Sequence, residues 1–182
     1  MFAMQAGGLE FEKVEEGEVK ATSLFELSGN DLMTNEVVPL SNFKGKVCLV
    51  VNVSSKCGLT PKNYPELEQL YKTYGPRGFV VLAFPTNQFA NQEPGTPEDI
   101  RKLVDGYGVT FPMFAKTDVN GLTAHPVFKF LKQNLGGVLG SSIKWNFTKF
   151  LCDRNGKPVK RYMPTTQPLS FVADIEALLD QE

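Results

Sequence analysis

Two short runs of hydrophobic residues dominate the first half of the chain, at residues 47–53 and 79–84. Neither run alternates strictly between hydrophobic and polar positions, which predicts strands buried on both faces, as in a parallel sheet covered by helices. Both runs are far too short to cross a bilayer as a helix. The chain is therefore expected to be built around two neighbouring buried strands.

A stretch with helical spacing follows each run. Hydrophobic residues recur at three- and four-residue intervals over residues 64–74, with Pro65 in the predicted first turn, where a missing N–H leaves no helical bond unmade. Residues 97–107 repeat the pattern, and Thr96 is placed to cap that helix. The order strand, helix, strand, helix predicts parallel pairing of the two strands.

The remaining hydrophobic segments are shorter and lie on both sides of this central pattern. An antiparallel hairpin is expected on each side, the second around the turn at residues 153–156. The expected elements are strands at 23–27, 37–40 and 111–116, a helix at 126–131, strands at 145–151 and 159–162, and a last helix capped by Ser170. Together they predict an α/β sandwich with a mixed central β-sheet flanked by helices and an N-terminal β-hairpin.

Composition fits one globular domain with a full core, because 42% of the 182 residues are hydrophobic and 21% are charged. Residues 1–20 are rich in Glu and lack both a basic start and a long hydrophobic run, so we expect a polar, flexible leader rather than a secretory signal. Residues 21–182 are expected to form the single domain. A net charge of -1 without a cluster of Lys or Arg argues against bulk binding to nucleic acid.

Three cysteines, Cys48, Cys57 and Cys152, are too few and too scattered for a disulfide framework or a zinc cluster. We therefore expect a reducing compartment, a cytoplasmic location and no metal site.

Cys48 and Cys152 lie in hydrophobic segments and are expected to be inert. Cys57 follows a buried strand, has polar neighbours and precedes a predicted helix, whose dipole favours a thiolate. Because a free cysteine is more often an inert hydrophobic residue, the local chemistry alone leaves both readings open.

The chain offers few partners for a reactive thiol. A thiol protease needs a histidine base, and the one histidine, His125, lies at a predicted helix start, where a capping role is commoner. A dithiol oxidoreductase needs a second cysteine three residues on, where the chain has Thr60. Reduction of a peroxide needs only one thiol, which becomes a sulfenic acid that another thiol reduces.

A peroxide-reducing thiol also needs neutral hydrogen-bond donors that steady the thiolate and the departing oxygen. Several amides, the last of them Gln92, follow the second buried strand, and Trp145 and Asn146 begin a later predicted strand. Spacing alone favours ordinary roles for these residues, as solvated amides or a buried indole.

Three segments resemble motifs of the glutathione peroxidase family and occur in that family's order. They read NVSSKCGLTPKNYPEL, LAFPTNQFANQEPG and IKWNFTKFLCDRNGKPVKRY, and the similarity extends from about residue 23 almost to the C-terminus. Within the family the chain is similar to the monomeric phospholipid hydroperoxide type. The resemblance implies a thioredoxin-like fold and a thiol-dependent peroxidase that reduces hydrogen peroxide and organic or lipid hydroperoxides to water and alcohols.

The same resemblance assigns site residues. It implies that Cys57 is the peroxidatic residue and that Gln92, Trp145 and Asn146 are its hydrogen-bonding partners. It implies no bound cofactor, with glutathione or a thioredoxin-type protein as the reducing co-substrate. Many family members carry selenocysteine at the position of Cys57, and the sequence leaves open whether this thiol is natural.

Two positions depart from the family pattern. Thr86 stands where the second motif usually has cysteine, and Asp105 stands where thioredoxin-dependent members carry their resolving cysteine. Without that residue the usual internal disulfide cannot form, so we expect a one-cysteine cycle in which an external thiol reduces Cys57 directly. A redox relay, in which Cys57 passes its oxidation to a partner protein, is the alternative, and a non-catalytic lipid-associated module is a third.

The segment at residues 131–143 is short compared with tetrameric family members, which implies a monomer with an open site. An open site admits lipid hydroperoxides and a transient contact with a membrane surface. Lys56, Lys144 and Arg161 are expected to form a weakly basic rim that binds the carboxylates of glutathione or the phosphates of lipids. The alternative is that they are ordinary solvated side chains.

Overall fold

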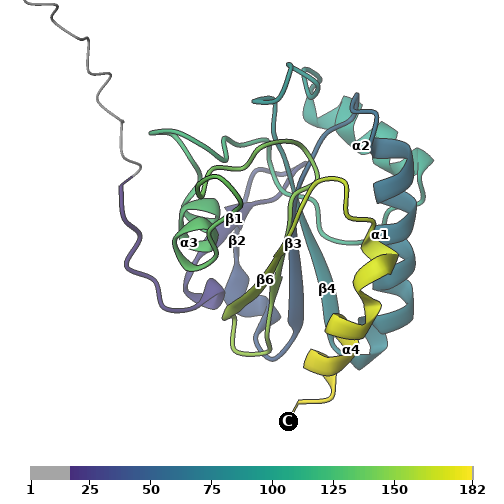
Figure 1. The fold of residues 1–182 in the computed structure, drawn as a ribbon. Helices are drawn as coiled ribbons and strands as arrows, with labels where there is room; N and C mark the ends of the chain where they lie inside the picture. Colours follow the sequence, from purple (N-terminus) through teal and green to yellow (C-terminus); the bar gives the residue numbers. More distant parts are fainter. Residues whose placement is uncertain (1–16, 182) are drawn as a thin grey trace, which may run out of the picture.

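β3 (Val47–Val53) lies in the interior of a four-stranded mixed sheet with the strand order β4-β3-β5-β6. It pairs in parallel with β4 (Phe79–Pro85) and antiparallel with β5 (Lys149–Cys152), which pairs antiparallel with β6 (Pro158–Tyr162). The computed structural model describes residues 17–181 (Figure 1). The predicted parallel pair and the late hairpin are both confirmed.

Helices cover both faces of this sheet (Figure 1). One face carries α1 (Thr60–Tyr74), α2 (Pro97–Gly106) and α4 (Val172–Leu179), and the other carries α3 (Pro126–Asn134). Short 3-10 helices connect the elements: η1 (Leu24–Glu26), η2 (Leu40–Phe43), η3 (Gly75–Arg77) and η4 (Pro168–Phe171). In the described part of the chain, every helix is too short or too polar to cross a membrane.

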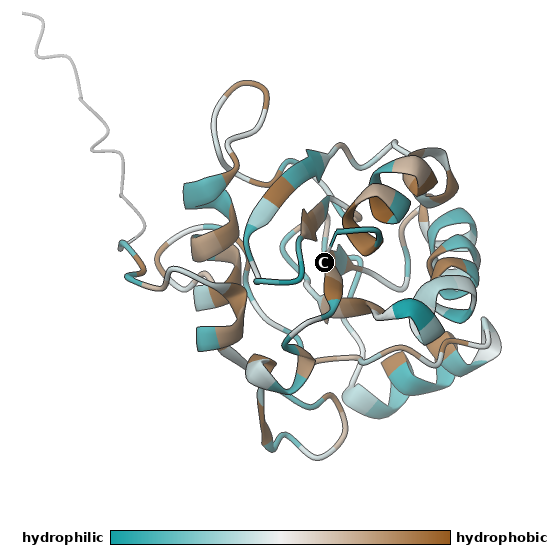
Figure 2. Cartoon of the chain, turned by 90° about the horizontal axis from the view of Figure 1, so that it is seen from below, coloured by the Kyte–Doolittle hydropathy of each residue, from teal (hydrophilic) through white to brown (hydrophobic). Residues whose placement is uncertain are grey.

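Side chains of β3 alternate between two hydrophobic cores. Leu49 and Val51 pack into the core beneath α1, α2 and α4, while Cys48 and Val50 pack into the core beneath α3. Every residue of β3 is buried, as its unbroken hydrophobic run predicted. Figure 2 shows hydrophobic residues concentrated on the strands and on the helix sides that face them.

The N-terminal hairpin forms, but its first arm lies later than predicted. β1 (Ser28–Asn30) pairs antiparallel with β2 (Val37–Pro39), and the two make a separate two-stranded sheet. Residues 23–27 are not a strand, because Ser23 and Glu26 form a capping box that starts η1. In the predicted leader, residues 1–16 lie outside the described residues, and the backbone of Val19 bonds to the side chain of Gln133 in α3 at 2.7 and 3.0 Å.

Four other predictions differ from the structure. Residues 145–148 are not a strand, since Phe147 has a φ of 65°, which β structure excludes. Residues 111–116 make only isolated bridges. α1 begins at Thr60, so that Pro65 lies inside the helix rather than in its first turn. Ser170 lies within η4, and its hydroxyl donates to the carbonyl of Gln167 instead of capping α4.

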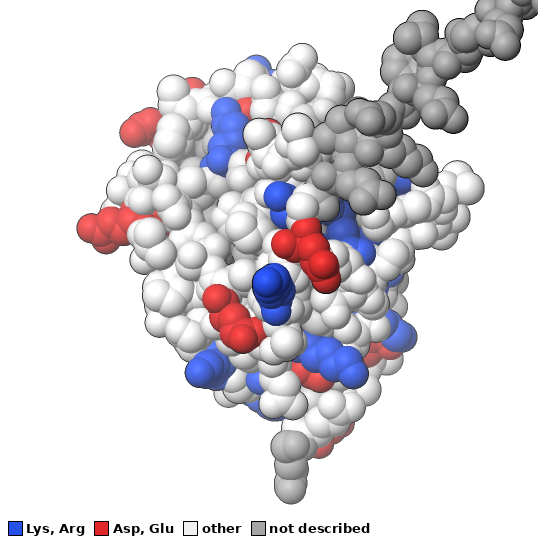
Figure 3. Space-filling view, turned by 90° about the vertical axis from the view of Figure 1, so that its left-hand side faces the viewer, with Lys and Arg blue, Asp and Glu red and all other residues white. Residues whose placement is uncertain are grey.

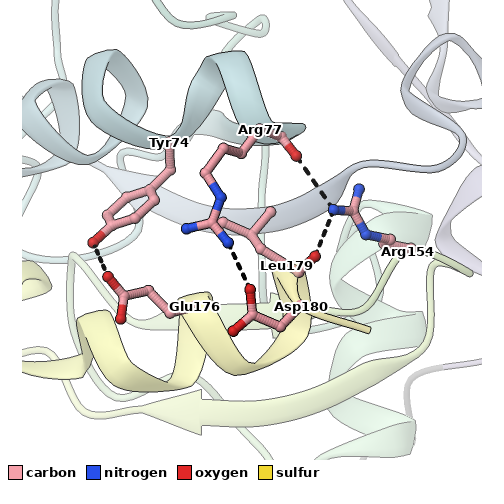
Figure 4. Close-up of polar contacts among 6 residues, drawn as sticks. All are labelled: Tyr74, Arg77, Arg154, Glu176, Leu179 and Asp180. Carbon is pink, nitrogen blue, oxygen red and sulfur yellow. Dashed lines mark hydrogen bonds and ion pairs between the residues drawn. The ribbon is translucent and has the colours of Figure 1, made fainter. Parts of the chain in front are cut away.

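Arg154, in the turn between β5 and β6, holds the C-terminal end of the chain in place. Its guanidinium donates to three backbone carbonyls, those of Gly45 at 2.8 Å, Arg77 at 3.2 Å and Leu179 at 2.8 Å. Figure 4 shows the bonds to Arg77 and Leu179. These carbonyls belong to the loop before β3, the end of η3 and the end of α4. One side chain therefore joins three segments that are distant in the sequence.

Two side-chain contacts also fasten α4 beside α1 and η3. The hydroxyl of Tyr74 donates to Glu176 at 2.6 Å, and Arg77 forms an ion pair with Asp180 at 2.6 Å (Figure 4). Both partners of the ion pair are well exposed, so solvent screens it. The three carbonyl bonds of Arg154 are expected to contribute more.

Replacing Arg154 with alanine is expected to lower the free energy of unfolding by about 2–3 kcal/mol, because three carbonyls lose a charged donor at once. Arg77→Ala, which removes the exposed ion pair, is the matched control and is expected to lower it by less than about 1 kcal/mol. Urea denaturation measures both. Equal losses in the two variants would contradict the role assigned to Arg154.

Lys149 is a fully buried lysine at the start of β5. Its ammonium donates to the carbonyls of Pro164 at 3.0 Å and Thr166 at 2.8 Å, and so holds the segment after β6 against the sheet. Burial lowers the pKa of Lys149 to about 7, while the charge of Glu66 acts in the opposite direction. The ammonium is thus held in the core by two carbonyl bonds.

Stability is expected to rise with pH above about 7, because the folded state then releases the Lys149 proton while the unfolded state keeps it up to its ordinary pKa of 10.5. Lys149→Met removes this contribution. The difference between the unfolding free energies of the two proteins, measured in urea at several pH values, should therefore change across this window. A constant difference would contradict the lowered pKa.

Candidate active site

Cys57 lies in the loop between the carboxyl end of β3 and the start of α1. Its side chain is only 6% exposed, and the backbone N–H of Leu59 points to its sulfur at 3.4 Å. The N–H of Thr60 bonds to the carbonyl of Cys57 at 3.1 Å, which fixes the turn into the helix. The sulfur therefore faces the amino-terminal end of α1, where the helix dipole is positive.

The loop that carries Cys57 is joined to the loop after β4. The hydroxyl of Ser54 donates to the carbonyl of Gln92 at 2.6 Å, and the backbone N–H of Lys56 donates to the same carbonyl at 3.0 Å. Ala90 and Asn91 have φ values of 54° and 52°, which reverse the chain just before Gln92. Gln92 is thereby set beside the cysteine loop.

A third segment reaches the same edge of the sheet through Asn52, the next-to-last residue of β3. The amide of Asn52 donates to the carbonyl of Trp145 at 3.1 Å, and the N–H of Phe147 donates to the carbonyl of Asn52 at 2.7 Å. Asn146, which lies between Trp145 and Phe147 in the chain, is fully buried. Its amide donates to the side-chain oxygen of Gln92 at 3.0 Å. That bond leaves the NH2 group of Gln92 as a donor for the site.

The structure thus brings the four predicted site residues to one edge of the sheet, from three separate segments. Trp145 is half-buried, and its ring packs against that of Phe89 with 5.8 Å between centroids. Gln92 and Asn146 are in direct contact, and Cys57 is joined to them through the loop bonds of Gln92. Neutral amide and indole donors therefore lie at the same edge of the sheet as the thiol.

The three predicted rim residues do not form one patch. Lys56 is exposed and lines a cavity of about 420 Å3 beside the cysteine loop. Lys144 and Arg161 line a different cavity of about 320 Å3, beneath residues 136–139. On the face with α3, basic and acidic side chains are interspersed (Figure 3).

Lys144 and Arg161 also have structural bonds. Lys144 donates to the carbonyl of Leu139 at 3.1 Å, and Arg161 donates to the carbonyls of Ser141 at 2.7 Å and Ser142 at 2.9 Å. The Arg161 guanidinium lies over the ring of Phe150, 5.0 Å from its centroid, and burial lowers its pKa. A role of these residues in substrate binding stays a prediction.

The histidine and the other two cysteines lie in structural positions, as a helix cap and in the buried sheet. His125 accepts a hydrogen bond from the N–H of Val127 and so caps α3, and burial lowers its pKa. Cys48 and Cys152 are fully buried opposite each other in β3 and β5. Burial raises the pKa of Cys48 to about 12 and also raises that of Cys152. Within the described residues no group of three or more His, Cys, Asp or Glu side chains is placed to hold a metal ion.

Both departures from the family pattern occupy defined positions. Thr86 is fully buried after β4, where its N–H bonds to the carbonyl of Val53 at 3.1 Å. Asp105 is exposed on α2 and pairs with Arg101 at 2.6 Å. Neither position supplies a thiol near Cys57.

Comparison with known proteins identifies the family. The family model described as "Glutathione peroxidase" matches residues 24–132. This chain belongs to the glutathione peroxidase family. A "Probable phospholipid hydroperoxide glutathione peroxidase" of Helianthus annuus is 56% identical over 144 residues, which cover 79% of this chain and 80% of that protein. A "Glutathione peroxidase homolog BsaA" of Halalkalibacterium halodurans is 52% identical over 158 residues, covering 86% and 99%.

Solved structures of similar proteins agree with this assignment. The crystal structure of Trgpx in apo form superposes with a TM-score of 0.74 at 41% identity and covers 88% of this chain and 97% of its own. A thioredoxin-family thiol:disulfide interchange protein from Chlorobium tepidum TLS has a TM-score of 0.63 at 17% identity, over 90% of this chain and 99% of its own, which shows the fold alone. The predicted thioredoxin-like fold and peroxidase class are confirmed.

Two residues of the site were missed from the sequence. Asn52, near the end of β3, was given no role from the sequence, yet it holds the segment of Trp145 and Asn146. Glu93 was quoted only within a motif, yet it is fully buried next to Gln92. A polar residue at the carboxyl end of a buried strand was the available signal for Asn52.

Replacing Asn52 with alanine is expected to slow oxidation of Cys57 by peroxide at least about tenfold, because the segment with Trp145 and Asn146 loses its tie to β3. The free energy of unfolding should also fall by about 1–2 kcal/mol. Asn134→Ala is the control, since it removes one amide-to-carbonyl bond of 2.8 Å in α3, away from the site. A similar peroxide rate for both variants would refute the positioning role.

Proposed function

We propose that this member of the glutathione peroxidase family works with one cysteine, and that an external thiol, such as glutathione, completes each cycle. The observation that carries this proposal is the position of the other two thiols. Cys48 lies at the far end of β3 from the Cys57 loop, roughly 17 Å from the end of the strand at the usual rise per residue. Cys152 pairs with Cys48 in the sheet. A disulfide needs Cα atoms within about 7 Å.

The proposed reaction uses the Cys57 thiol and the neutral donors at its edge of the sheet. The Cys57 thiolate attacks one peroxide oxygen, the S–O bond forms as the O–O bond breaks, and the leaving oxygen takes a proton to become water or an alcohol. Gln92, Trp145 and Asn146 supply neutral donors for the thiolate and the departing oxygen. One external thiol then displaces water from the sulfenic acid to give a mixed disulfide. A second thiol releases Cys57 and leaves as the external disulfide.

Lipid hydroperoxides are proposed as substrates besides hydrogen peroxide. Support comes from hydrophobic side chains exposed beside the cavity of Lys144 and Arg161: Val138 is 74% exposed, Leu139 is 91% exposed and Met163 is 61% exposed. Such a patch is suited to contact with lipid. A monomeric state, a cytoplasmic location and transient membrane contact complete the proposal.

A redox relay is the second candidate. It is favoured by the missing partner at Asp105, because a sulfenic acid that no internal thiol resolves persists for a partner protein to reduce. Turnover with glutathione and with thioredoxin, measured against trapping of mixed disulfides with proteins, separates the two. Rapid turnover with glutathione supports the peroxidase cycle.

Peroxide treatment in the absence of reductant is expected to oxidise Cys57 to a sulfenic acid, and added glutathione to give a mixed disulfide of one glutathione per chain. Mass spectrometry of the intact protein and of its peptides detects both species. Cys57→Ser should lose peroxidase turnover completely, whereas Cys48→Ser, in the buried sheet, should retain the reaction with peroxide wherever it folds. An internal disulfide at Cys57 would contradict the one-cysteine cycle.

A further inference from the structure

Cys48 and Cys152 form a pair of thiols outside the candidate active site. β3 and β5 are antiparallel neighbours, and the two cysteines lie directly opposite each other in their ladder. Both carry free thiols, and none of their surface is exposed. The one-cysteine cycle uses neither of them, so the pairing of two cysteines at one position of the sheet needs its own explanation.

The register of the two strands brings these thiols within reach of a disulfide. Directly opposite residues of an antiparallel pair have Cα atoms about 4.5 or 5.5 Å apart, and both separations fall within the range of about 4.4–6.8 Å found in disulfides. Both side chains pack into the core beneath α3, so they lie on the same face of the sheet. Burial, and then the charge of Cys48, raises the pKa of Cys152, as expected for neighbouring sulfur atoms.

The pair lies at one end of the sheet, next to exposed segments. Cys48 is the second residue of β3, and Cys152 is the last residue of β5. The Cys48 thiol donates to the carbonyl of Lys46 at 3.5 Å, and both Lys46 and Asn155, in the turn after β5, are exposed. Because the ends of strands open more readily than their centres, local opening here admits a small oxidant to both thiols.

Oxidation of the pair is expected to be slow. Burial raises the pKa of Cys48 to about 12, against the opposing charge of Lys46, so the reactive thiolate is rare at neutral pH. Cys57 lies beyond the other end of β3, so each buried thiol has the other as its partner. The pair therefore responds to an oxidant that persists after Cys57 has reacted.

We propose that Cys48 and Cys152 form a reversible disulfide that joins β3 to β5 when hydroperoxide is in excess. The Cys48 thiolate attacks one peroxide oxygen, the S–O bond forms as the O–O bond breaks, and the leaving oxygen takes the thiol proton and departs as water or an alcohol. The Cys152 sulfur then displaces hydroxide, the S–S bond forms as the S–O bond breaks, and hydroxide leaves with the Cys152 proton as water. Two thiols and one hydroperoxide thus give one disulfide, one alcohol and one water. Cys57 takes no part, so the inference goes beyond the one-cysteine cycle.

Such a disulfide would stabilise the fold and still be easy to reduce. It closes a loop of about 100 residues, which removes many conformations from the unfolded chain. Directly opposite residues have Cβ atoms about 4.5–5.5 Å apart, whereas a disulfide needs about 3.5–4.5 Å, so the strands must move slightly closer and the bond is strained. Strained disulfides are readily reduced by external thiols. The pair is therefore suited to a switch that stabilises the chain under oxidative load.

The test treats the full chain carrying Cys57→Ser, which lacks the faster thiol, with hydrogen peroxide at neutral pH. Mass spectrometry of unreduced peptides is expected to find Cys48 joined to Cys152, with the loss of two hydrogens. The reaction should be at least about 100-fold slower than oxidation of Cys57 in the wild type. The midpoint of thermal unfolding is expected to rise by at least about 5 °C and to return after incubation with glutathione.

The matched control adds Cys152→Val to Cys57→Ser, which keeps a hydrophobic residue in the sheet and should abolish both the joined peptides and the rise in midpoint. Wild-type chain treated in the same way decides the matter if either variant does not fold. Free or separately oxidised Cys48 and Cys152, in chains whose Cys57 is fully oxidised, would overturn the proposal, as would a joined pair without a higher midpoint. A disulfide between Cys57 and either cysteine would overturn the one-cysteine cycle as well. A wild-type Cys57 that does not react with peroxide, beside a joined pair, would overturn only the proposed function.

Discussion

The carbonyl of Gln92 accepts two hydrogen bonds from the Cys57 loop, and the arrangement of the site depends on them. They form because β3 and β4 run in parallel and end at the same edge of the sheet, with Val53 opposite Pro85 in the ladder. A shift of one residue in that register would turn the side chains of one strand to the opposite face and move its loop away. The unbroken burial of both strands fixes the register, so the hydrophobic cores also determine the geometry of the chemistry.

Much of this arrangement was predictable from the sequence, and the reasons differ from element to element. The buried strands were placed correctly because a short hydrophobic run between polar loops has few other structures open to it. The second helix was predicted correctly because Thr96 and Asp99 form its cap within four residues. Where a local pattern competed with another, the prediction failed, as at residues 23–27, where a capping box outweighs the tendency to form a strand.

Contacts between distant segments left no signal in the sequence. Lys144 and Arg161 resembled surface charges, yet both bond to carbonyls of the loop that follows α3. The positive φ of Phe147, whose N–H bonds to the carbonyl of Asn52, delays the start of β5 to Lys149, and the hydrophobic residues around Phe147 do not reveal this. The resemblance to a family supplied Gln92, Trp145 and Asn146, whereas spacing alone had favoured ordinary roles for them.

Buried polar atoms without hydrogen-bond partners are concentrated around Cys57, and this distribution can be explained by the chemistry. Among the described residues such atoms occur at the end of β3, in the cysteine loop, in the first turns of α1, and in the segments of Glu93 and Asn146. They belong to Asn52, Asn63, Tyr64 and Asn146 and, apart from the hydrogen bonds by which Ser55 lowers the pKa of Glu93, to Ser55 and Glu93. Each lowers stability where it stands, since a buried polar group without a partner loses its bonds to water. Hydrogen-bond capacity that is unused in the resting fold remains available when charge moves from sulfur to the departing oxygen. The cores above and below the sheet offset this local cost, which is why the reactive edge can remain incompletely paired.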